Sequence, residues 1–311
     1  MTDYTTLIDA ETWVFIRETD AWYPPDAVGL TVEEQRAVYN RMCRAFHRGY
    51  PDGVTATDLT IDSGGHALPL RRYTRAGGSA AAAVLYFHGG GFVVGGLESH
   101  DDVCAEICGA TGFDVISVDY RLAPEHRHPA AFDDAAAAFD WLSRDTQLPL
   151  VLAGDSAGGN LAAAVAHAAR GRDRAAVGQV LIYPGLGGPM DRGSWITHAE
   201  APMLSVRDIL FYRDIRAGAT PTDGDPTAAP LQDTDYSGLP PTAIFTAECD
   251  PLSSDGELYR DRIVAAGGRA RWTEERGLVH GYLRARRTVS RARDSFARIV
   301  EAIGEMGRAD R

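Results

Sequence analysis

Leu148-Pro-Leu-Val-Leu-Ala-Gly-Asp-Ser-Ala-Gly158 is the stretch of this sequence that decides the fold. Its first six residues are almost entirely apolar, which is typical of a short strand covered on both faces. An alanine-rich segment that ends near Arg170 follows it. Gly154-Asp-Ser-Ala-Gly158 therefore matches Gly-x-Ser-x-Gly between a strand and a helix, where a sharp turn projects the serine hydroxyl outward. The two glycines are needed because a Cβ there would collide with the adjoining strand or helix. We predict that Ser156 is a nucleophile, with a plain loop serine as the alternative.

The chain around this turn predicts an α/β fold. From Val54 onward, short apolar or β-branched runs alternate with alanine-rich, helix-period stretches, which is the pattern of βα units around a mostly parallel sheet. The predicted strands are residues 54–61, 67–74, 82–87, 114–119, 148–153, 177–183, 242–247 and 270–274. The predicted helices are residues 99–110, 130–144, 157–170, 254–266 and 288–303, and the arginines of the last one fall on its wet face.

Two segments fall outside the alternation. Residues 1–50 predict two helices, and Thr31-Val-Glu-Glu34 is a capping box at the start of the second. Residues 185–238 begin and end rich in glycine and proline, with a helix predicted near 205–216. We expect residues 1–50 to be cap helices and residues 51–311 to be the catalytic domain, with about 185–222 contributing to the cap. Simple packing at the edge of the sheet is the alternative.

His88-Gly-Gly-Gly91 directly follows the predicted strand 82–87. Attack on an ester carbonyl creates an oxyanion, which is stabilised by backbone N–H donors that no side chain obstructs. We expect these donors to be the amides of Gly90, Gly91 and Ala157, the last of which begins a helix. A phosphate-binding loop is the rival interpretation. It does not fit the dinucleotide fingerprint, because Val94 stands where that pattern needs its third glycine.

The general base is expected last in the chain order Ser, Asp or Glu, His that this architecture uses. His280 is the only histidine after His198. Asp250 lies just beyond the predicted strand 242–247, before Pro251, in the region where site residues of open parallel sheets gather. We predict that His280 shuttles the proton and that Asp250 orients its imidazole.

Other carboxylates and histidines compete for these roles. Glu248 is the nearest rival of Asp250, because strand alternation puts both on one side. Asp255 and Glu257 fall in Ser254-Asp-Gly-Glu257, which is interpreted as a capping box that starts the next helix. Asp155 is expected to be a local hydrogen-bond acceptor, and His88 to brace its loop. The pair His126 and His128 has no third metal ligand nearby and is assigned to a surface loop.

Composition excludes several function classes. The chain has 311 residues, 45% apolar and 24% charged, as in ordinary globular proteins. It contains no lysine. This excludes enzymes that form a Schiff base on lysine, nucleotide-binding sites that need the lysine of a Walker-type loop, and Ser-x-x-Lys mechanisms. A formal charge of −12 opposes nucleic acid or an anionic membrane as the main partner.

We expect no cofactor and no metal. Lacking a signal-peptide pattern or a long apolar run, the chain is expected to be cytoplasmic, without stable membrane association. The four cysteines are expected to be buried, reduced thiols: Cys43, Cys104, Cys108 and Cys249.

Several blocks, in this order, resemble the hormone-sensitive-lipase-like esterases of the α/β-hydrolase superfamily. They are His88-Gly-Gly-Gly-Phe-Val-Val-Gly95, Asp119-Tyr-Arg-Leu-Ala-Pro-Glu125, Gly154-Asp-Ser-Ala-Gly-Gly-Asn160, Gly238-Leu-Pro-Pro-Thr242, Asp250-Pro-Leu252 and His280-Gly-Tyr282. The resemblance implies an eight-stranded core with a helical lid, and it carries Ser156, Asp250 and His280 over as the catalytic triad. It also implies hydrolysis of short-chain acyl esters. Residues 1–50 match least.

We therefore expect a serine carboxylesterase that forms an acyl-enzyme and acts on a small-molecule ester. An amidase, lactonase, thioesterase or acyltransferase would share this machinery and differ in the shape of the pocket. A lipase acting at a lipid interface would need a broad apolar lid. A non-catalytic ligand-binding protein on the same scaffold would be expected to lose the base, and His280 is present. Relatives of this kind are thought to pair, so a homodimer is a further expectation.

Overall fold

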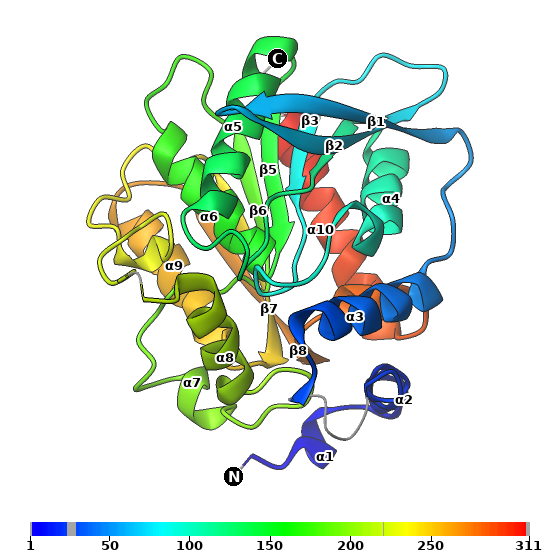
Figure 1. Cartoon of the computed structure of the whole chain (residues 1–311), viewed down its shortest axis with the longest axis vertical. Helices are drawn as coiled ribbons and strands as arrows, with labels where there is room; N and C mark the ends of the chain where they lie inside the picture. The colour runs from blue at the N-terminus through cyan, green and yellow to red at the C-terminus, as the bar shows by residue number, and fades with distance from the viewer. Residues whose placement is uncertain (1, 24–28, 220, 309–311) are drawn as a thin grey trace.

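The computed structural model describes residues 2–23, 29–219 and 221–308. Within them, eight strands form one sheet in the order β1-β2-β4-β3-β5-β6-β7-β8 (Figure 1). The strands are β1 (Val54–Ser63), β2 (His66–Arg75), β3 (Ala83–Phe87), β4 (Asp114–Val118), β5 (Leu150–Asp155), β6 (Gly178–Ile182), β7 (Thr242–Cys249) and β8 (Ala270–Val279). β2 pairs antiparallel with β1 and β4, and the other pairs are parallel. The predicted α/β fold and its eight strands are confirmed.

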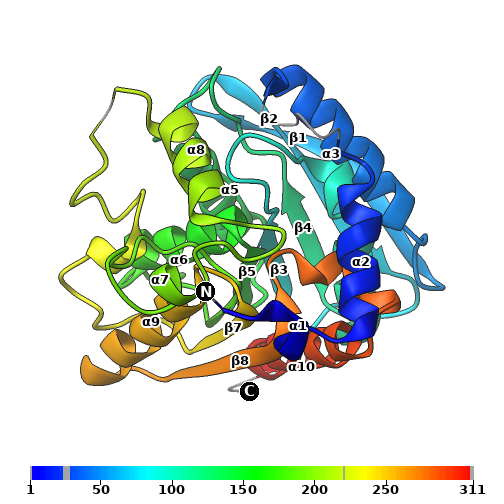
Figure 2. The same cartoon turned by 90° about the horizontal axis from the view of Figure 1, so that it is seen from below.

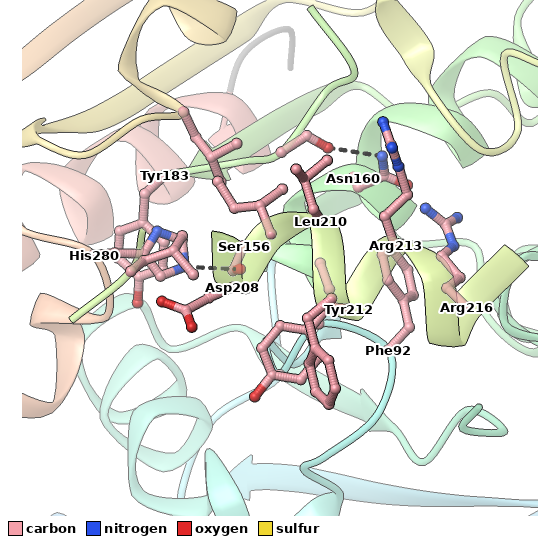
Figure 3. A pocket seen from close by; sticks show the side chains of 18 of the residues that line it. Phe92, Ser156, Asn160, Tyr183, Asp208, Leu210, Tyr212, Arg213, Arg216 and His280 are labelled. Atoms are coloured by element: carbon pink, nitrogen blue, oxygen red, sulfur yellow. Dashed lines mark hydrogen bonds between the residues drawn. The ribbon is translucent and has the colours of Figure 1, made fainter. Parts of the chain in front are cut away.

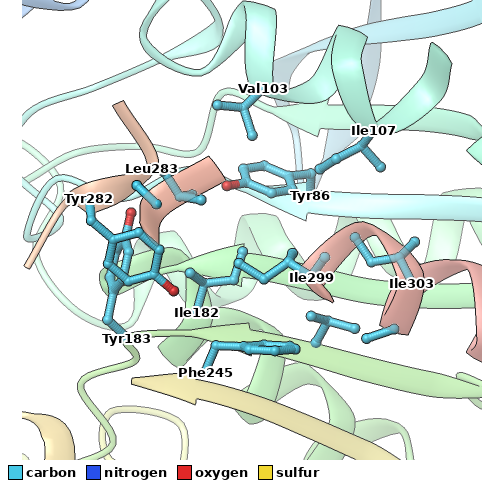
Figure 4. Close-up of a cluster of buried hydrophobic side chains, with 14 of the residues drawn as sticks. Tyr86, Val103, Ile107, Ile182, Tyr183, Phe245, Tyr282, Leu283, Ile299 and Ile303 are labelled. Carbon is cyan, nitrogen blue, oxygen red and sulfur yellow. The ribbon is translucent and has the colours of Figure 1, made fainter. Parts of the chain in front are cut away.

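Helices cover both faces of the sheet because its central strands are apolar on both. In β3, Val84 and Tyr86 join one buried cluster, while Leu85 and Phe87 join the other. The covering helices are α4 (Asp101–Thr111) and α10 (Ser290–Arg308) on the first face, and α5 (Ala130–Asp145), α6 (Ala157–Ala169) and α9 (Ser253–Ala265) on the second. Figure 4 shows Ile299 of α10 packed toward this first face. The sheet is therefore a fixed platform for residues at the ends of its strands.

The described residues form five further α-helices: α1 (Tyr4–Leu7), α2 (Ala10–Asp20), α3 (Val32–Phe46), α7 (Ser194–Thr197) and α8 (Val206–Ala217). Of these, α2 adds Phe15 and Ile16 to the buried cluster of the first face. Figure 2 shows α8 on one side and α2 with α3 on the other. We call α2, α3 and α8 the cap helices. The capping box of Thr31 and Glu34 is formed as predicted, with Thr31 N donating to the Glu34 carboxylate at 2.8 Å. The sequence predicted two helices here, and the short α1 is an addition.

One boundary error matters for the site. The sequence predicted that the last strand ends at residue 274, but β8 continues to Val279. Two glutamates and two arginines interrupt the apolar pattern between residues 271 and 276, while the strand keeps pairing with β7, and Cys249 is opposite Val279. His280 therefore follows the strand directly, and its position is set by the sheet.

Candidate active site

The turn after β5 has the strained geometry that its sequence predicts. Ser156 has φ 53° and ψ −116°, a backbone conformation that non-glycine residues rarely adopt, and α6 begins at the next residue. A Cβ on Gly158 would lie 1.9 Å from the carbonyl oxygen of Phe87, and one on Gly154 would lie 2.4 Å from that of Gly158. Both glycines are therefore required for the close contact between β3, β5 and α6.

Three side chains from separate segments meet beside this turn. His280 Nε2 lies 2.9 Å from Ser156 Oγ (Figure 3). His280 Nδ1 lies 2.7 Å from Asp250 Oδ2. Asp250 is fully buried, and its Oδ1 accepts a hydrogen bond from the Leu252 amide at 2.9 Å. A hydroxyl, an imidazole and a carboxylate in this order can generate a nucleophile and hold the imidazole in one tautomer.

The rival carboxylates lie elsewhere. Glu248 accepts hydrogen bonds from Arg276 and from the Gly277 amide, both at 2.7 Å, outside the Ser156 cluster. The predicted capping box of Ser254 and Glu257 is wrong. α9 begins at Ser253 without a side-chain cap, because the Ser254 hydroxyl is engaged with Ser194 at 2.8 Å.

Asp255, which the sequence placed in that capping box, is instead a buried anchor. Its carboxylate accepts hydrogen bonds from the amides of Leu186 and Gly188 and from the Trp195 indole, at 2.9, 3.2 and 2.9 Å. Burial raises the pKa of this carboxyl to about 6, against the effect of those hydrogen bonds. It therefore fixes the start of the segment that leads to α8. Its partners lie about 60 to 69 residues away, so no local sequence pattern indicates this role.

The glycine loop after β3 presents main-chain donors to the same cavity. Gly90 and Gly91 have φ 130° and 60°, and the Gly90 carbonyl accepts hydrogen bonds from the Val93 and Val94 amides. Gly90, Gly91 and Ala157 line the cavity together with Ser156. Among the residues that the structure describes, the amides of these three make no backbone hydrogen bond. Such amides can stabilise a developing oxyanion, and their assignment to that role stays a prediction.

Asp155 links this loop to the turn that carries Ser156. Its Oδ1 accepts hydrogen bonds from the Gly89 amide at 3.0 Å and the Tyr86 hydroxyl at 2.8 Å. Its Oδ2 lies 3.1 Å from His100 Nε2 and 3.3 Å from the Tyr183 hydroxyl. Burial alone would raise the pKa of this carboxyl, but the His100 imidazole and the hydroxyl donors lower it to about 2. Asp155 is thus the local acceptor that the sequence predicted, but His100 had no signal in the sequence.

His88 lies beneath the loop. It is fully buried, its ring is stacked on Tyr120 with centroids 4.2 Å apart, and its Nδ1 lies 2.8 Å from the Gly89 carbonyl oxygen. Burial, reinforced by the neighbouring His100, lowers the pKa of His88 to about 4, so the ring is neutral near pH 7. This arrangement agrees with the predicted bracing role.

Of the remaining histidine and cysteine predictions, one is wrong and the others agree with the structure. His126 is exposed as expected. The assignment of His128 to the surface is wrong, because its ring is buried and its Nε2 lies 2.8 Å from the Asp225 carboxylate. All four cysteines are buried and free.

The candidate site opens into a cavity of about 910 Å³. Its lining combines the turn, the glycine loop and the cap helices, with residues such as Ser156, Gly91, Tyr39 and Tyr212. Apolar and aromatic side chains with a few polar groups are typical of a small-molecule site. Within residues 2–23, 29–219 and 221–308, none of the helices combines the length and the apolar character needed to span a bilayer.

Comparison with known proteins agrees with this geometry. A family model described as the alpha/beta hydrolase fold matches residues 84–284. The carboxylic ester hydrolase LipN of Mycobacterium tuberculosis is 35% identical over 271 residues, which is 82% of this chain and 72% of that protein. The ethyl acetate hydrolase of Pseudomonas putida is 34% identical over 264 residues, 81% of this chain and 83% of that protein.

Solved structures are similar along nearly the whole chain. The hyperthermophilic esterase of the archaeon Pyrobaculum calidifontis superposes with a TM-score of 0.88 at 30% identity, covering 96% of this chain and 99% of that one. The carboxylesterase EstE1 from a metagenomic library has a TM-score of 0.84 at 32% identity, covering 90% of this chain and 99% of that one. The sheet, the sequence matches and these superpositions together place the chain in the α/β-hydrolase fold family, among the hormone-sensitive-lipase-like members that its motifs resemble.

Proposed function

We propose that this protein is a serine carboxylesterase that hydrolyses short-chain acyl esters of small molecules. The observation that carries the proposal is the chain of contacts from Ser156 Oγ through His280 to Asp250, at 2.9 and 2.7 Å. Relatives named as carboxylic ester hydrolases and ethyl acetate hydrolase support the ester bond as the target. No step of this reaction requires a cofactor or a metal.

The first half of the proposed reaction transfers the acyl group to the enzyme. Ser156 Oγ attacks the ester carbonyl while its proton passes to His280 Nε2, and the carbonyl oxygen becomes an oxyanion held by the amides of Gly90, Gly91 and Ala157. The tetrahedral intermediate collapses as the C–O bond to the alcohol breaks. The leaving alkoxide takes the proton from His280, and the acyl group stays on Ser156.

The second half regenerates the enzyme. Water attacks the acyl carbonyl and gives one proton to His280 Nε2, and the same amides hold the second oxyanion. When the Ser156–acyl bond breaks, His280 returns that proton to Ser156 Oγ, and the carboxylic acid leaves. Asp250 accepts the Nδ1–H of His280 throughout and stabilises the imidazolium that forms.

We also propose that residues 1–50 and about 185–222 act as a cap over the catalytic domain of residues 51–311. The cap helices supply Thr19, Tyr39 and Tyr212 to the cavity wall, which supports this division. Homodimer formation and a cytoplasmic location stay predictions from the sequence.

The proposal is tested with purified protein and 4-nitrophenyl esters of increasing acyl length, beside matched anilide and thioester substrates. The expected result is turnover of short acyl esters that collapses above medium chains, with a fluorophosphonate bound covalently to Ser156. Ser156→Ala should lower kcat/KM by about three decades or more. A preference for the anilide or thioester would favour the sister activities, and turnover of long chains would favour a lipase. Near-normal turnover by Ser156→Ala would refute the proposal.

A further inference from the structure

Two arginines in the cavity wall stand out because they are half-buried without an acidic partner, unlike the exposed Arg207 of the same wall. Arg216 of α8 and Arg284 of the short 3-10 helix η4 (Tyr282–Arg287) both line it, and within the described ranges neither has a carboxylate oxygen within 4.0 Å. Several arginines elsewhere hold carboxylates with their Nε and Nη2 atoms, as Arg71 holds Asp58 and Arg121 holds Asp134. Others, such as Arg174, bind backbone carbonyls only. In a chain with 43 acidic and 31 basic residues, two half-buried cations without an acidic partner in the wall of the candidate site need an explanation.

Arg284 is held in place through Nη2, and its other two nitrogens make no hydrogen bond to the residues that the structure describes. Its Nη2 donates a hydrogen bond to the Tyr39 hydroxyl of α3, and its guanidinium carbon lies 4.8 Å from the centre of the Tyr39 ring. Its Nε is buried without a partner. Its Nη1 makes no hydrogen bond among the described residues, and unlike Nε it is not fully shielded from solvent. Nη1 lies 3.3 Å from the position that a Cβ on Gly281 would occupy.

The position of Nη1 indicates which half of an ester it would meet. Gly281 follows His280, and in the proposed reaction His280 gives its proton to the leaving alcohol. The alcohol portion therefore leaves toward His280 Nε2, on the side of the cavity that His280 and Gly281 line. We propose, on the basis of the proposed function, that Arg284 forms a carboxylate subsite on the leaving-group side of the cavity. The favoured substrates are then short-chain esters of hydroxy acids, in which the alcohol portion carries the carboxylate.

Arg216 adds positive charge, but its free donor edge is shielded from solvent. Its guanidinium carbon lies 3.5 Å from the centre of the Phe92 ring, and its Nη1 donates to the Ala228 carbonyl at 3.0 Å. Its Nε and Nη2 are shielded from solvent and unpartnered. Figure 3 shows Arg216 and Phe92 across the cavity from His280. Arg216 therefore attracts an anion through the low-dielectric interior but does not bind it.

The acidic residues of the cavity wall cancel these charges only in part. Asp208 accepts hydrogen bonds from the Ser205 amide and hydroxyl at the start of α8. Asp155 is attracted to Arg284, but its two oxygens are hydrogen-bonded to Gly89 and His100 among others. Asp20 and Asp223 are exposed, so water and salt screen them. A carboxylate that reaches Arg284 gains a charge-assisted hydrogen bond and relieves a poorly compensated cation.

The test compares esters that form the same acetyl-enzyme. The substrates are 4-acetoxybutanoate and 4-acetoxybutanamide, which have one ester bond each, are nearly the same size and differ in the charge of the leaving alcohol, with acetate release as the readout. We expect wild type to favour the anionic ester by about tenfold to a hundredfold in kcat/KM, equivalent to about 1.4 to 2.8 kcal/mol. Arg284→Met should reduce this ratio to about 1, and added NaCl should weaken the preference in wild type.

Matched variants separate charge from packing. Arg284→Gln keeps a donor for the Tyr39 hydroxyl but removes the charge, and it too should lose the preference. Arg287→Met is the control, because Arg287 lies on the same 3-10 helix, pairs with Glu106 and does not line the cavity. Its ratio should match wild type. Equal rates for the two esters in wild type, or a preference that survives both Arg284 variants, would overturn the subsite. The subsite would also be overturned if wild type preferred 4-nitrophenyl hemiglutarate, which carries its carboxylate on the acyl side, over a neutral 4-nitrophenyl ester by a larger factor than that between the two acetate esters. If wild type hydrolyses neither acetate ester nor short 4-nitrophenyl esters, the proposed function itself fails.

Discussion

Asp250 and His280 are 30 positions apart in the chain, but the Asp250 carboxylate lies 2.7 Å from His280 Nδ1. β7 and β8 are adjacent parallel strands, and each residue lies just beyond the end of its strand. The buried carboxylate accepts the Nδ1–H, which leaves Nε2 free to receive the proton of Ser156. The sheet therefore selects the tautomer of the proposed base.

Asp250→Asn is expected to lower kcat for short acyl esters by about 10⁴-fold, because an amide favours the wrong imidazole tautomer. The matched control is Glu248→Gln, since Glu248 lies two residues away but binds Arg276 and Gly277 instead of His280. Steady-state kinetics of the two variants decide between these carboxylates. A larger loss in the glutamate variant would contradict the assignment of Asp250.

Gly90→Ala is expected to damage the proposed oxyanion hole. A Cβ at Gly90 would lie 2.1 Å from the carbonyl oxygen of Val94, so the loop must move and its amides with it. Loss of one such donor typically lowers kcat by about 10²- to 10³-fold. The measurement is kcat for a short 4-nitrophenyl ester, and circular dichroism checks the fold. Gly78→Ala is the control, because a Cβ at Gly78 meets nothing within 4 Å.

Ser156→Gly is expected to be more stable than Ser156→Ala. Residue 156 has φ 53° and ψ −116°, and a strained non-glycine conformation of this kind costs about 1 to 3 kcal/mol. Glycine relieves that strain, although its greater freedom in the unfolded chain offsets about 0.5 to 1 kcal/mol of the gain. We expect a net advantage of about 1 kcal/mol in chemical denaturation. Equal stability of the two inactive variants would argue against strain at this turn.

His88 is expected to make the protein less stable in mild acid. Burial lowers the pKa of His88 to about 4 from an ordinary value of 6.5, so the unfolded chain binds more protons between these values. Its contribution to stability is therefore complete above pH 6.5 and decreases as the pH falls toward 4, by about 3 kcal/mol in all. Asp255, whose pKa is raised to about 6, acts in the opposite direction over part of this range.

The comparison of wild type with His88→Asn isolates this histidine. Denaturation midpoints are measured from pH 7 to pH 4, and the acid-induced loss should be smaller in the variant. Identical pH profiles would show that His88 does not titrate as its burial requires. Histidine NMR of the wild type offers a direct check, since the His88 resonance should stay that of a neutral ring down to about pH 4.

Much of the fold follows from patterns within a few residues. Continuous apolar runs located the central strands, and Gly154 with Gly158 located the turn, because close packing excludes a Cβ there. The order of Ser156, Asp250 and His280 along the strands was enough to predict which side chains would approach one another. Local periodicity and chain direction carry this information.

What the sequence did not indicate depends on contacts between distant residues. Asp255 was assigned to a local capping box, but its partners come from the segment 186–195. His128 was placed on the surface, although it pairs with Asp225, 97 residues away. The extension of β8 to Val279 reflects pairing with β7 rather than its own polar sequence. In each case tertiary packing outweighed the local pattern.

The Asp155 carboxylate that ties the Gly89 amide to the serine turn also separates two tasks within the molecule. The atoms that would break the bond belong to a single framework anchored in the sheet, which also carries Arg284, whereas Thr19, Tyr39 and Tyr212 of the cavity wall belong to helices outside it. Substitutions on α3 or α8 should therefore change which substrates are accepted without moving Ser156, His280 and Asp250. For an engineer, the two properties can be optimised one at a time.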